Sequence, residues 1–475
     1  MNNCIKTHWP LAAVIFIFTL IRVIVIPHPD IITWDASVYV GMGKYLFSHG
    51  TVGVWESLRP VGLPIILGAL WKLGIAPYTA GMVFSFLVSA AMLAMVYTIA
   101  EQARKGAGTI ATVLLAATEL FFIYSAIPVT DITSTFFAVL GLYLTYNAKT
   151  NKQYFIAGMI IALGLLFRFP QGLMLVVALL VIAIKSFQQQ KGKWSDRIVQ
   201  MIERCFVLGG GFFVIVVPFL VVNYYVYGNA FLPFIEGTAV VKLYPSLYQK
   251  GVWFYVTGLF KQDPLLYLAL LPVGMLWKKA WRSPSVIATV TAFFIVTAYF
   301  VYQPHKELRY MLAFMPYAAV LAGIGIAYLL EWWKLPQLLF FGLFFITAFM
   351  LTAGMIVHPF HDKDAKALYA FNTYFDATPK ARILSSTPYT LAYSNVLITR
   401  TLYDDWNDAY VAYNTLKTSN DYIALDTCNL ELGCTDNSHC KDKKQALLDE
   451  LNKQNTPMFS ETTPNQCLLA IYKIQ

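Results

Sequence analysis

Charge is scarce in this sequence of 475 residues. Asp, Glu, Lys and Arg together make up 13% of it, whereas these residues make up about 25% of an ordinary soluble domain. Hydrophobic residues make up 58%. This composition excludes an ordinary soluble domain and indicates a membrane protein.

Several common signatures are also missing. The sequence has no Gly-rich phosphate-binding loop and no dinucleotide-binding fingerprint, so nothing in it indicates nucleotide chemistry. It has no internal repeat and no low-complexity tract. It also lacks any Asn-x-Ser/Thr triplet, so the chain itself offers no standard acceptor for an N-linked glycan.

Long apolar runs, in contrast, are abundant. A helix needs about 20 mostly apolar residues to cross the hydrocarbon core of a bilayer. The sequence therefore predicts an α-helical polytopic membrane protein with about 11 transmembrane helices. The apolar stretches lie near residues 10–27, 78–100, 107–127, 131–147, 153–168, 169–187, 205–227, 264–280, 284–303, 310–330 and 336–357.

Basic residues predict the orientation of these spans. The segment after the first span has no small-residue cleavage pattern, so we expect an uncleaved span with a cytoplasmic N-terminus. Alternation from there places most Lys and Arg of the connections in the cytoplasm, as the positive-inside rule requires. An odd number of spans then places the C-terminus outside. We expect an integral protein of the plasma membrane, an inner membrane or the endoplasmic reticulum.

The chain changes character near its C-terminus. Residues 358–475 contain 11 Lys/Arg and 14 Asp/Glu, a net charge of −3 that leaves +12 for residues 1–357. The overall charge of +9 therefore reflects orientation and requires no nucleic-acid partner. Short β-rich runs alternate with polar helical stretches here. We predict a transmembrane domain over 1–357 and a small extracytoplasmic α/β domain over 358–475.

Four of the six cysteines lie in this C-terminal part. An even number of cysteines in an extracytoplasmic segment favours disulfides. The alternative is a metal site that also uses His439, but the spacing fits no standard zinc pattern. We therefore expect disulfides among Cys428, Cys434, Cys440 and Cys467.

Two outer connections are long, at residues 28–77 and 228–263. The first contains RPVGLPIILGALWKLGI, an apolar stretch interrupted by Pro60, Gly62 and Pro64. It predicts helices that lie along the interface and not a full span. The second contains KLYPSLYQKGVWFYV, whose aromatic residues suit an interfacial belt.

Ionisable side chains on the outer side need a reason, because each is costly near membrane depth unless it is paired or hydrated. They come from separate parts of the sequence but share one face of the membrane. A single site at the outer leaflet would have this property. The residues are Asp35, Glu56, Arg59, Asp131, Arg168, Lys242, His305, Lys306, Glu307 and Arg309.

Each of these residues also has a structural alternative. Asp35 and Asp131 each precede a helical pattern and could cap the helix N-terminus. Arg168 could extend from a span end to the interface. In the HKELR stretch, Glu307 could pair with Lys306 or Arg309 inside its own loop.

Four stretches at these positions resemble a known family. They are TWDASVYV around Asp35, RPVGLP from Arg59, the Asp131 segment between spans three and four, and HKELRYMLAFMPYAAVLAG from His305. Together they resemble the GT-C superfamily of integral-membrane glycosyltransferases, closest to the protein mannosyltransferase and aminoarabinose transferase relatives. HKELRY is also similar to the His-Lys-Glu-x-Arg-Phe motif of lipid-linked-oligosaccharide and glycolipid-anchor mannosyltransferases.

The resemblance implies a hexosyl- or pentosyltransferase. Members of the superfamily take a sugar from a polyprenyl-phosphate carrier at the outer or lumenal face and give it, with inversion, to an acceptor, which here would be a protein, glycan or lipid. The family's first-loop motif is often Asp-Glu, whereas Ala36 follows Asp35 here. This departure keeps the first acid and puts in doubt any role that needs the second.

Chemistry assigns roles to these residues. A carboxylate must take the proton of the acceptor hydroxyl, and Asp35 is the matching residue, with Asp131 as a second catalytic candidate. Fixed cations must stabilise the leaving lipid phosphate, and Arg168, His305, Lys306 and Arg309 suit this role. No cofactor is certain: Mg²⁺ or Mn²⁺ could share the phosphate with the oxygen ligands of Asp35 and Asp131, but nothing in the spacing demands it. Further site candidates are Glu56, Arg59, Glu307 and Tyr39.

Two other function classes remain open from the sequence. A transporter or flippase of a lipid-linked anionic substrate would use a similar cationic site, but such proteins typically show internal repeats and broken helices near the midplane. A non-catalytic membrane subunit or receptor would use the outer α/β domain to bind a partner. Sugar transfer by the purified protein would separate an enzyme from both.

Overall fold

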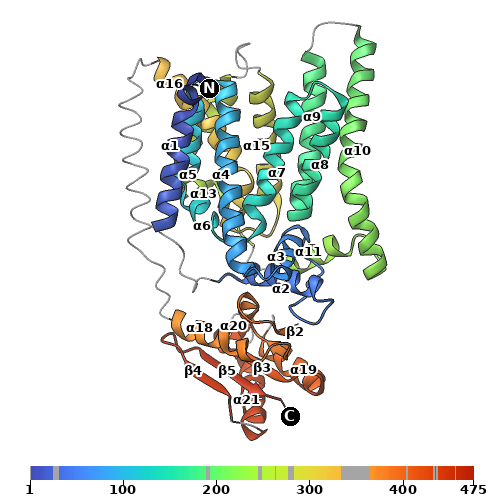
Figure 1. Cartoon of the computed structure of the whole chain (residues 1–475), viewed down its shortest axis with the longest axis vertical. Helices are drawn as coiled ribbons and strands as arrows, with labels where there is room; N and C mark the ends of the chain where they lie inside the picture. The colour runs from blue at the N-terminus through green and yellow to red at the C-terminus, as the bar shows by residue number, and fades with distance from the viewer. Residues whose placement is uncertain are drawn as a thin grey trace.

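The computed structural model describes most of the chain. It covers residues 2–24, 32–188, 193–243, 249–262, 264–275, 283–332 and 364–474, with short gaps at 403–404, 432–433, 435–436 and 455. Figure 1 shows a helical bundle above and a small sheet with its helices below. Both parts of the predicted fold class, the polytopic helical part and the C-terminal α/β part, are therefore confirmed.

The bundle follows the apolar runs of the sequence. Most of its helices begin and end within a few residues of the predicted spans. Its elements, with η for 3₁₀ helices, are α1 (Asn2–Ile24), α4 (Pro77–Ala103), α5 (Ala107–Ala117), α6 (Glu119–Tyr124), α7 (Thr130–Asn147), α8 (Asn151–Phe167), η1 (Phe169–Gly172), α9 (Leu173–Gln188), α10 (Trp194–Tyr227), η2 (Pro264–Ala269), α14 (Leu270–Met275), α15 (Pro284–Tyr302), η4 (Leu308–Ala313) and α16 (Met315–Trp332).

Five described helices are long and apolar enough to cross a membrane. They are Pro77–Ala103, Phe169–Gln188, Trp194–Tyr227, Pro284–Tyr302 and Met315–Trp332. Shorter apolar helices stand beside them, as Figure 1 shows for α1, α5 and α8. The total of 11 spans stays a prediction, because the stretch 336–357 lies outside the described residues.

One predicted span differs from its helix. The stretch 107–127 forms two helices, α5 and α6, which meet at Thr118 in extended backbone. The Thr118 hydroxyl donates to the Leu114 carbonyl one turn earlier. Hydropathy is continuous across this point, so the apolar pattern carries no sign of the break.

Glycine allows two of the helices to pack very closely. A Cβ on Gly158 of α8 would lie 2.0 Å from the Leu208 carbonyl oxygen of α10. A Cβ on Gly211 of α10 would lie 2.0 Å from the Phe155 carbonyl oxygen of α8. Small residues that let backbones approach are typical of helix contacts in membranes.

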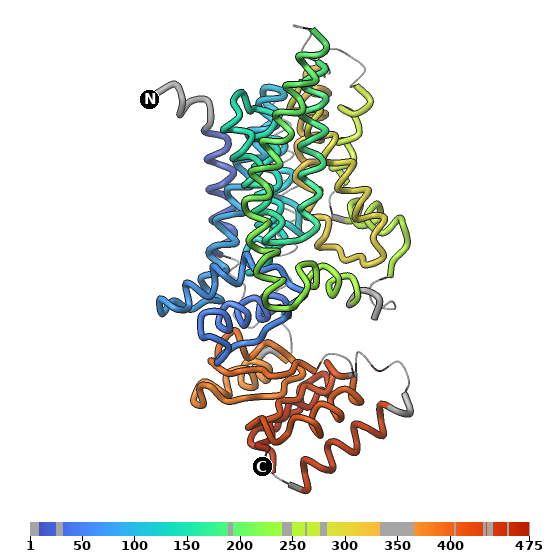
Figure 2. Tube along the Cα trace, turned by 90° about the vertical axis from the view of Figure 1, so that its right-hand side faces the viewer, coloured from blue at the N-terminus to red at the C-terminus, as the bar shows by residue number. Residues whose placement is uncertain are grey.

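Short helices lie across one end of the bundle, which we call the domain-bearing end. They are α2 (Trp34–Phe47), α3 (Gly62–Lys72) and α11 (Leu232–Leu243). A further short helix, α13 (Phe254–Gln262), packs against η2 and η4 of the bundle. Figures 1 and 2 show α2 and α3 between the bundle and the C-terminal part. The apolar stretch that starts at Arg59 thus forms the 11-residue helix α3, too short for a full span, as expected.

The C-terminal part is a five-stranded sheet with helices. Its strand order is β2-β1-β3-β5-β4. Strands β2, β1 and β3 run parallel, and β5 is antiparallel to both β3 and β4. The elements are α18 (Ala365–Thr373), η5 (Tyr374–Ala377), β1 (Arg382–Ser385), η6 (Tyr389–Ala392), β2 (Leu397–Thr401), α19 (Trp406–Leu416), η7 (Lys417–Ser419), β3 (Tyr422–Asp426), α20 (Thr427–Glu431), α21 (Asn437–Gln454), β4 (Phe459–Thr462) and β5 (Leu468–Lys473).

Two disulfides join the four cysteines of this part. Cys428 pairs with Cys467, and Cys434 pairs with Cys440. The prediction of disulfides is therefore confirmed over the alternative of a metal site. The first bridge fastens the start of α20, directly after β3, to the start of β5.

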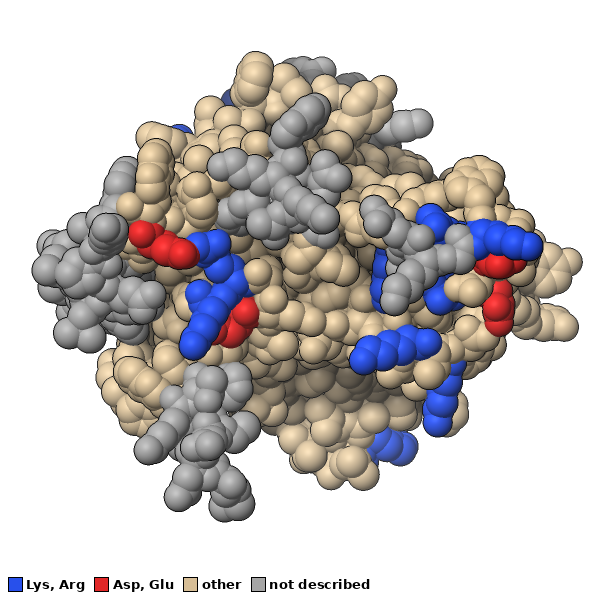
Figure 3. Space-filling model, turned by 90° about the horizontal axis from the view of Figure 1, so that it is seen from above, with Lys and Arg blue, Asp and Glu red and all other residues tan. Residues whose placement is uncertain are grey.

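The opposite end of the bundle is basic. Figure 3, which looks onto that end, shows Lys and Arg side chains outnumbering Asp and Glu there. Basic residues of the connections at this end include Lys105 and Lys149, both exposed. The site candidates lie at the other end.

Candidate functional site

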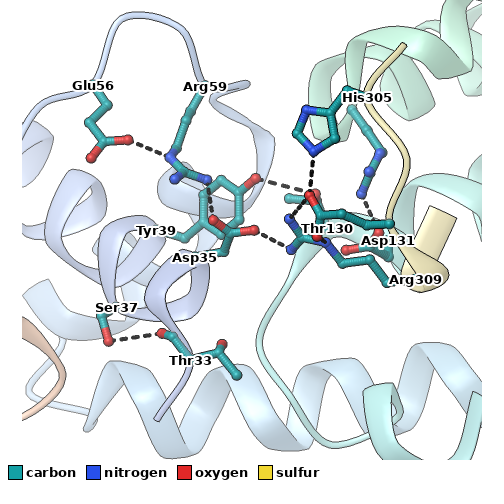
Figure 4. A network of polar contacts seen from close by, with 12 residues as sticks. Thr33, Asp35, Ser37, Tyr39, Glu56, Arg59, Thr130, Asp131, His305 and Arg309 are labelled. Carbon is teal, nitrogen blue, oxygen red and sulfur yellow. Dashed lines mark hydrogen bonds and ion pairs between the residues drawn. The ribbon is translucent and has the colours of Figure 1, made fainter. Parts of the chain in front are cut away.

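The candidate site lies where α2 meets the bundle. Helix α2 begins after Thr33, whose extended backbone makes it the N-cap residue, and Asp35 lies in the first turn. Thr33, and not Asp35, therefore holds the N-cap position. The Asp35 side chain points instead toward two arginines, as Figure 4 shows. The capping interpretation of Asp35 is therefore wrong.

Asp35 is held between arginines from two distant parts of the chain. Its Oδ1 accepts from Nη1 of Arg59 at 2.7 Å, and its Oδ2 accepts from Nη1 of Arg309. Arg59 also donates from Nε to Glu56 at 2.5 Å. The side chains of Asp35, Arg59 and Arg309 are 14 to 19% exposed. The first loop and the HKELR stretch thus meet at one carboxylate.

These contacts decide the charge of Asp35. Burial by itself would raise the pKa of its carboxyl group, but the charges of Arg309 and Arg59 outweigh burial and hold the pKa well below the usual range. Asp35 is therefore ionised at neutral pH. In this state it is a weak proton acceptor until one of the arginines is drawn away.

The HKELR stretch forms a compact network around Glu307. The Glu307 carboxylate contacts Nε2 of His305 at 2.7 Å and Nε of Arg309 at 2.7 Å. The Tyr310 hydroxyl donates to the same carboxylate at 3.0 Å. Burial alone would raise the pKa of Glu307, but His305 and Arg309 outweigh it and lower the pKa to about 2. The stretch is thus internally paired, as its structural alternative proposed, yet Arg309 also reaches Asp35.

A second ion pair lies beside this network. Arg168, directly after α8, donates from Nη1 to Oδ1 of Asp131 in the first turn of α7. The Asp131 side chain is only 3% exposed. The N-cap residue of α7 is Val129, so the capping interpretation of Asp131 is wrong. The guanidinium of Arg168 lies over the Tyr310 ring at 4.6 Å, which links the pair to the HKELR network.

Two remaining candidates lie at the edge of the site. The Tyr39 ring lies 5.4 Å from the Arg59 guanidinium, and its hydroxyl is 3.4 Å from Oγ1 of Thr130. Lys306 is buried, and its Nζ donates to the Gln303 carbonyl at 2.6 Å. This bond directs the Lys306 ammonium to a backbone carbonyl, so Lys306 lies beside the network of ion pairs and not within it.

Charge in the network is nearly balanced. Four carboxylates, from Asp35, Glu56, Asp131 and Glu307, face three guanidiniums, from Arg59, Arg168 and Arg309. Each guanidinium already contacts at least one carboxylate. An anion that enters the site must therefore replace a carboxylate as the partner of an arginine.

The acids of the site do not belong to any described group of three His, Cys, Asp or Glu ligands. Among the described residues, one group of three His, Cys, Asp or Glu ligand atoms lies within 4.8 Å, and it consists of Asp426, Cys428 and Cys467. Those two cysteines are joined to each other. The expectation that Mg²⁺ or Mn²⁺ binds between Asp35, Asp131 and a substrate phosphate stays a prediction, and we derive no step through a metal.

Sequence reasoning missed two residues of the network. Tyr310 contacts Glu307, His305 and Arg168, and Thr130 contacts Tyr39. Tyr310 directly follows Arg309, so its position next to the motif was a usable signal. Thr130 offers no such signal, because a threonine at the start of a helix is common.

Comparison with known proteins supports the same fold. Residues 59–221 match the dolichyl-phosphate-mannose-protein mannosyltransferase family. This range includes Arg59, Asp131 and Arg168, and it excludes Asp35 and the HKELR stretch. No curated protein matches the sequence.

Solved structures match over much more of the chain. ArnT from Cupriavidus metallidurans, bound to undecaprenyl phosphate, has a TM-score of 0.62 at 10% identity, over 99% of this chain and 98% of that one. The oligosaccharyltransferase AglB from Archaeoglobus fulgidus, in complex with an inhibitory peptide and a dolichol-phosphate, has a TM-score of 0.58 at 12% identity, over 98% and 74%.

A third match is shorter. The arabinofuranosyltransferase AftD from Mycobacteria has a TM-score of 0.50 at 12% identity, over 88% of this chain and 35% of that one. All of these structures are GT-C glycosyltransferases. The chain therefore shares the fold of these glycosyltransferases, as the resemblance implied, and it is an integral membrane protein. The similarity of HKELRY to the mannosyltransferase motif stays a prediction.

Proposed function

We propose that this protein is a glycosyltransferase that moves a sugar from a polyprenyl-phosphate-linked donor to a protein, glycan or lipid acceptor at the outer or lumenal face of the membrane. The observation that carries this proposal is the Asp35 carboxylate held between Arg59 and Arg309. In this arrangement the proposed proton acceptor, Asp35, directly contacts a proposed phosphate-binding side chain, Arg309.

The proposed reaction is a single displacement with inversion. The acceptor oxygen forms a bond to the anomeric carbon, while the bond from that carbon to the phosphate oxygen breaks. The acceptor proton passes to the Asp35 carboxylate, which acts as general base. Polyprenyl phosphate leaves with the bonding electrons, and its negative charge needs fixed cations.

Arg309 is placed to couple these events. It contacts both Asp35 and Glu307, so it can exchange Asp35 for a phosphate oxygen and remain held by Glu307. This exchange removes a cation from Asp35, and the pKa of Asp35 rises toward the value that a general base needs. The donor would thus activate the base by binding.

Arg168, His305 and Lys306 complete the proposed phosphate site. Arg168 and His305 both contact Tyr310, which fixes their direction, and Lys306 lies beside them. Asp131 holds Arg168 in place and is the second catalytic candidate. Support for a lipid-linked donor comes from the fold shared with ArnT bound to undecaprenyl phosphate and AglB bound to dolichol-phosphate.

One experiment tests the proposal directly. Purified full-length protein in detergent is incubated with radiolabelled undecaprenyl-phosphate-linked and dolichyl-phosphate-linked sugars, together with a membrane extract as the source of acceptors. We expect label to move from the donor to an acceptor, and the Asp35→Asn variant serves as the matched control.

A transporter or flippase predicts the opposite pattern. It would show no turnover in detergent, where no sealed compartment exists, but would move the same lipid across the membrane of sealed proteoliposomes. That combination of results would overturn the proposal of an enzyme.

A further inference from the structure

Helix η6 of the C-terminal part is fixed tightly on α2, the helix that carries Asp35. The Lys44 ammonium of α2 donates to the carbonyls of Leu391 at 2.8 Å and Ser394 at 3.0 Å. A Cβ on Gly41 would lie 2.4 Å from Cδ1 of Leu391. Helices α2 and η6 are therefore in direct contact, and residues of both can contribute to the same site.

A backbone bridge adds to this contact. The Gly53 amide, in the loop after α2, donates to the Val396 carbonyl at 2.7 Å, and the Ile398 amide donates to the Gly53 carbonyl at 2.8 Å. The first loop thus pairs with the edge strand β2. Both contacts hold the C-terminal part against α2 and the loop that follows it, and Figure 1 shows the two parts of the molecule meeting at α2.

Tyr389 of η6 lies against the residue that precedes Asp35. Its ring packs edge-on against the ring of Trp34 at 6.0 Å. Burial, then the negative charges of Asp426 and Asp35, raises the pKa of Tyr389 to about 12. The hydroxyl is protonated at neutral pH, as it is in an ordinary tyrosine, and it can donate a hydrogen bond to a ligand.

Asp426 supplies the second polar group. It ends β3, and its Oδ1 accepts from the amides of Cys428 at 3.1 Å and Asn429 at 3.3 Å. Both bonds use the same oxygen, so Oδ2 is left to accept from a ligand. The disulfide from Cys428 to Cys467 fixes the turn that follows. Ligands commonly bind outside the carboxyl ends of parallel strands, which is where this carboxylate lies.

The neighbouring turn also has unpaired hydroxyls. Thr387 and Thr390, on either side of Tyr389, are 1% and 0% exposed, and their Oγ1 atoms have no hydrogen-bond partner among the described residues. Buried hydroxyls are normally paired. Both hydroxyl oxygens are closed off from the surface, so the side chain at this turn that a ligand can reach is the partly exposed Tyr389.

We propose that Trp34, Tyr389 and Asp426 form a binding subsite for a saccharide on the acceptor side of Asp35. Aromatic rings offer an apolar face to a sugar ring, while a phenol and a carboxylate bond its hydroxyls. The inference rests on the proposed glycosyl transfer and deepens it, since it names a glycan or glycolipid as the acceptor.

Saturation-transfer-difference NMR on the full-length protein in detergent tests this subsite without any donor. The probes are the methyl glycosides of mannose, glucose and galactose. We expect at least one to receive saturation from the wild-type protein. Tyr389→Phe keeps the ring and removes one hydrogen bond, so we expect its affinity for that probe to fall about three- to tenfold.

The control is Tyr410→Phe, which removes a hydroxyl from α19, where the Tyr410 ring contacts Lys443. It should bind the probe as the wild type does. Retained binding of undecaprenyl phosphate by Tyr389→Phe would show that the variant is folded.

Three results would overturn the subsite: no saturation of any glycoside by the wild type, equal affinity in Tyr389→Phe, or Tyr389-dependent binding of a Ser/Thr peptide in place of a sugar. Failure of the labelled-donor assay, in contrast, would overturn the proposed transfer while leaving the NMR result as it stands.

Discussion

Asp35 is the proposed general base, and it also contacts Arg309 of the proposed phosphate site. One substitution separates the catalytic role of Asp35 from a role in assembling the site. Asp35→Asn should reduce transfer by at least about 10²-fold, because an amide cannot accept the acceptor's proton. The protein should stay folded, since Asn is almost the same size. Donor turnover and binding of undecaprenyl phosphate by the purified variant are the measurements.

Near-normal turnover by the Asn variant would exclude Asp35 as the base and would move the assignment to Asp131 or Glu56. Loss of both turnover and phosphate binding would point to a role in assembling the site, because Asp35 also holds Arg59 and Arg309.

Replacing Arg309 and replacing Arg168 should have different effects on phosphate affinity and on thermal stability. Arg309→Ala removes a charge-assisted bond to phosphate, worth roughly 1.5–3 kcal/mol, so affinity for undecaprenyl phosphate should fall by about one to two decades. Arg168→Ala has a second effect, because it leaves the buried Asp131 without its cation. We expect lower thermal stability in that variant, and recovery when Asp131→Asn is added.

Arg382→Ala is the matched control for both, since Arg382 is an exposed arginine of β1. Unchanged phosphate affinity in Arg309→Ala with a loss of stability would show that Arg309 is a structural tie and not a phosphate ligand.

At the residue scale, the sequence predicted which groups gather but not how they pair. The cost of a charge near the membrane is a property of one residue, so Asp35, Arg168 and the HKELR stretch could be identified from the sequence. The choice of partner depends on the fold. Arg59 bonds both Asp35 and Glu56, and no local pattern specifies that.

At the scale of elements, helix α2 contacts both parts of the molecule. Its Asp35 contacts Arg309 of the bundle, and its Lys44 bonds backbone carbonyls of the C-terminal part. Lys44 is 1% exposed, and burial, partly offset by the charge of Asp376, lowers its pKa to about 8. No local pattern around Lys44 indicates this, because the carbonyls that bind its ammonium lie 347 and 350 positions away.

Lys44 predicts how stability depends on pH. A lysine ammonium ordinarily has a pKa of 10.5, so between about pH 8 and pH 10.5 the unfolded chain holds a proton that the folded chain has lost. The contribution of Lys44 to the free energy of unfolding therefore rises with pH in this window, by up to about 3 kcal/mol. Thermal unfolding in detergent at about pH 7 and about pH 10 measures it.

Because other groups also titrate at these pH values, the comparison is with Lys44→Met, which should lack this rise. Lys72→Met, at the exposed end of α3, is the matched control and should follow the wild type. An identical pH dependence in wild type and Lys44→Met would refute the assignment.

The helices were predicted well from the sequence where hydrophobicity alone determines the structure. Long apolar runs identified α4, α9 and α10, because hydrophobicity alone decides which segments enter a bilayer. The break at Thr118 and the 3₁₀ helix η4 were not predicted, since both are set by backbone packing and not by hydropathy.

At the scale of the whole molecule, charge and disulfides mark the two ends. The domain-bearing end carries the acidic C-terminal part and both disulfides, while the opposite end is basic (Figure 3). Disulfides persist on the oxidising side of a membrane, and basic connections stay in the cytoplasm. These two rules rest on different chemistry, and both favour the orientation that we propose.

The orientation is open to a direct test with fused reporters. A reporter after Gln475 should read as extracytoplasmic, because it joins the disulfide-bonded part. A reporter in the connection at residues 188–197 should read as cytoplasmic, because that connection is basic and joins α9 to α10 at the end far from the site. Alkaline phosphatase and green fluorescent protein fusions at both places give opposite signals if this holds. If both places are labelled from the same side, the number of spans between them is wrong, and Asp35 would no longer be assigned to the face where a lipid-linked donor is presented.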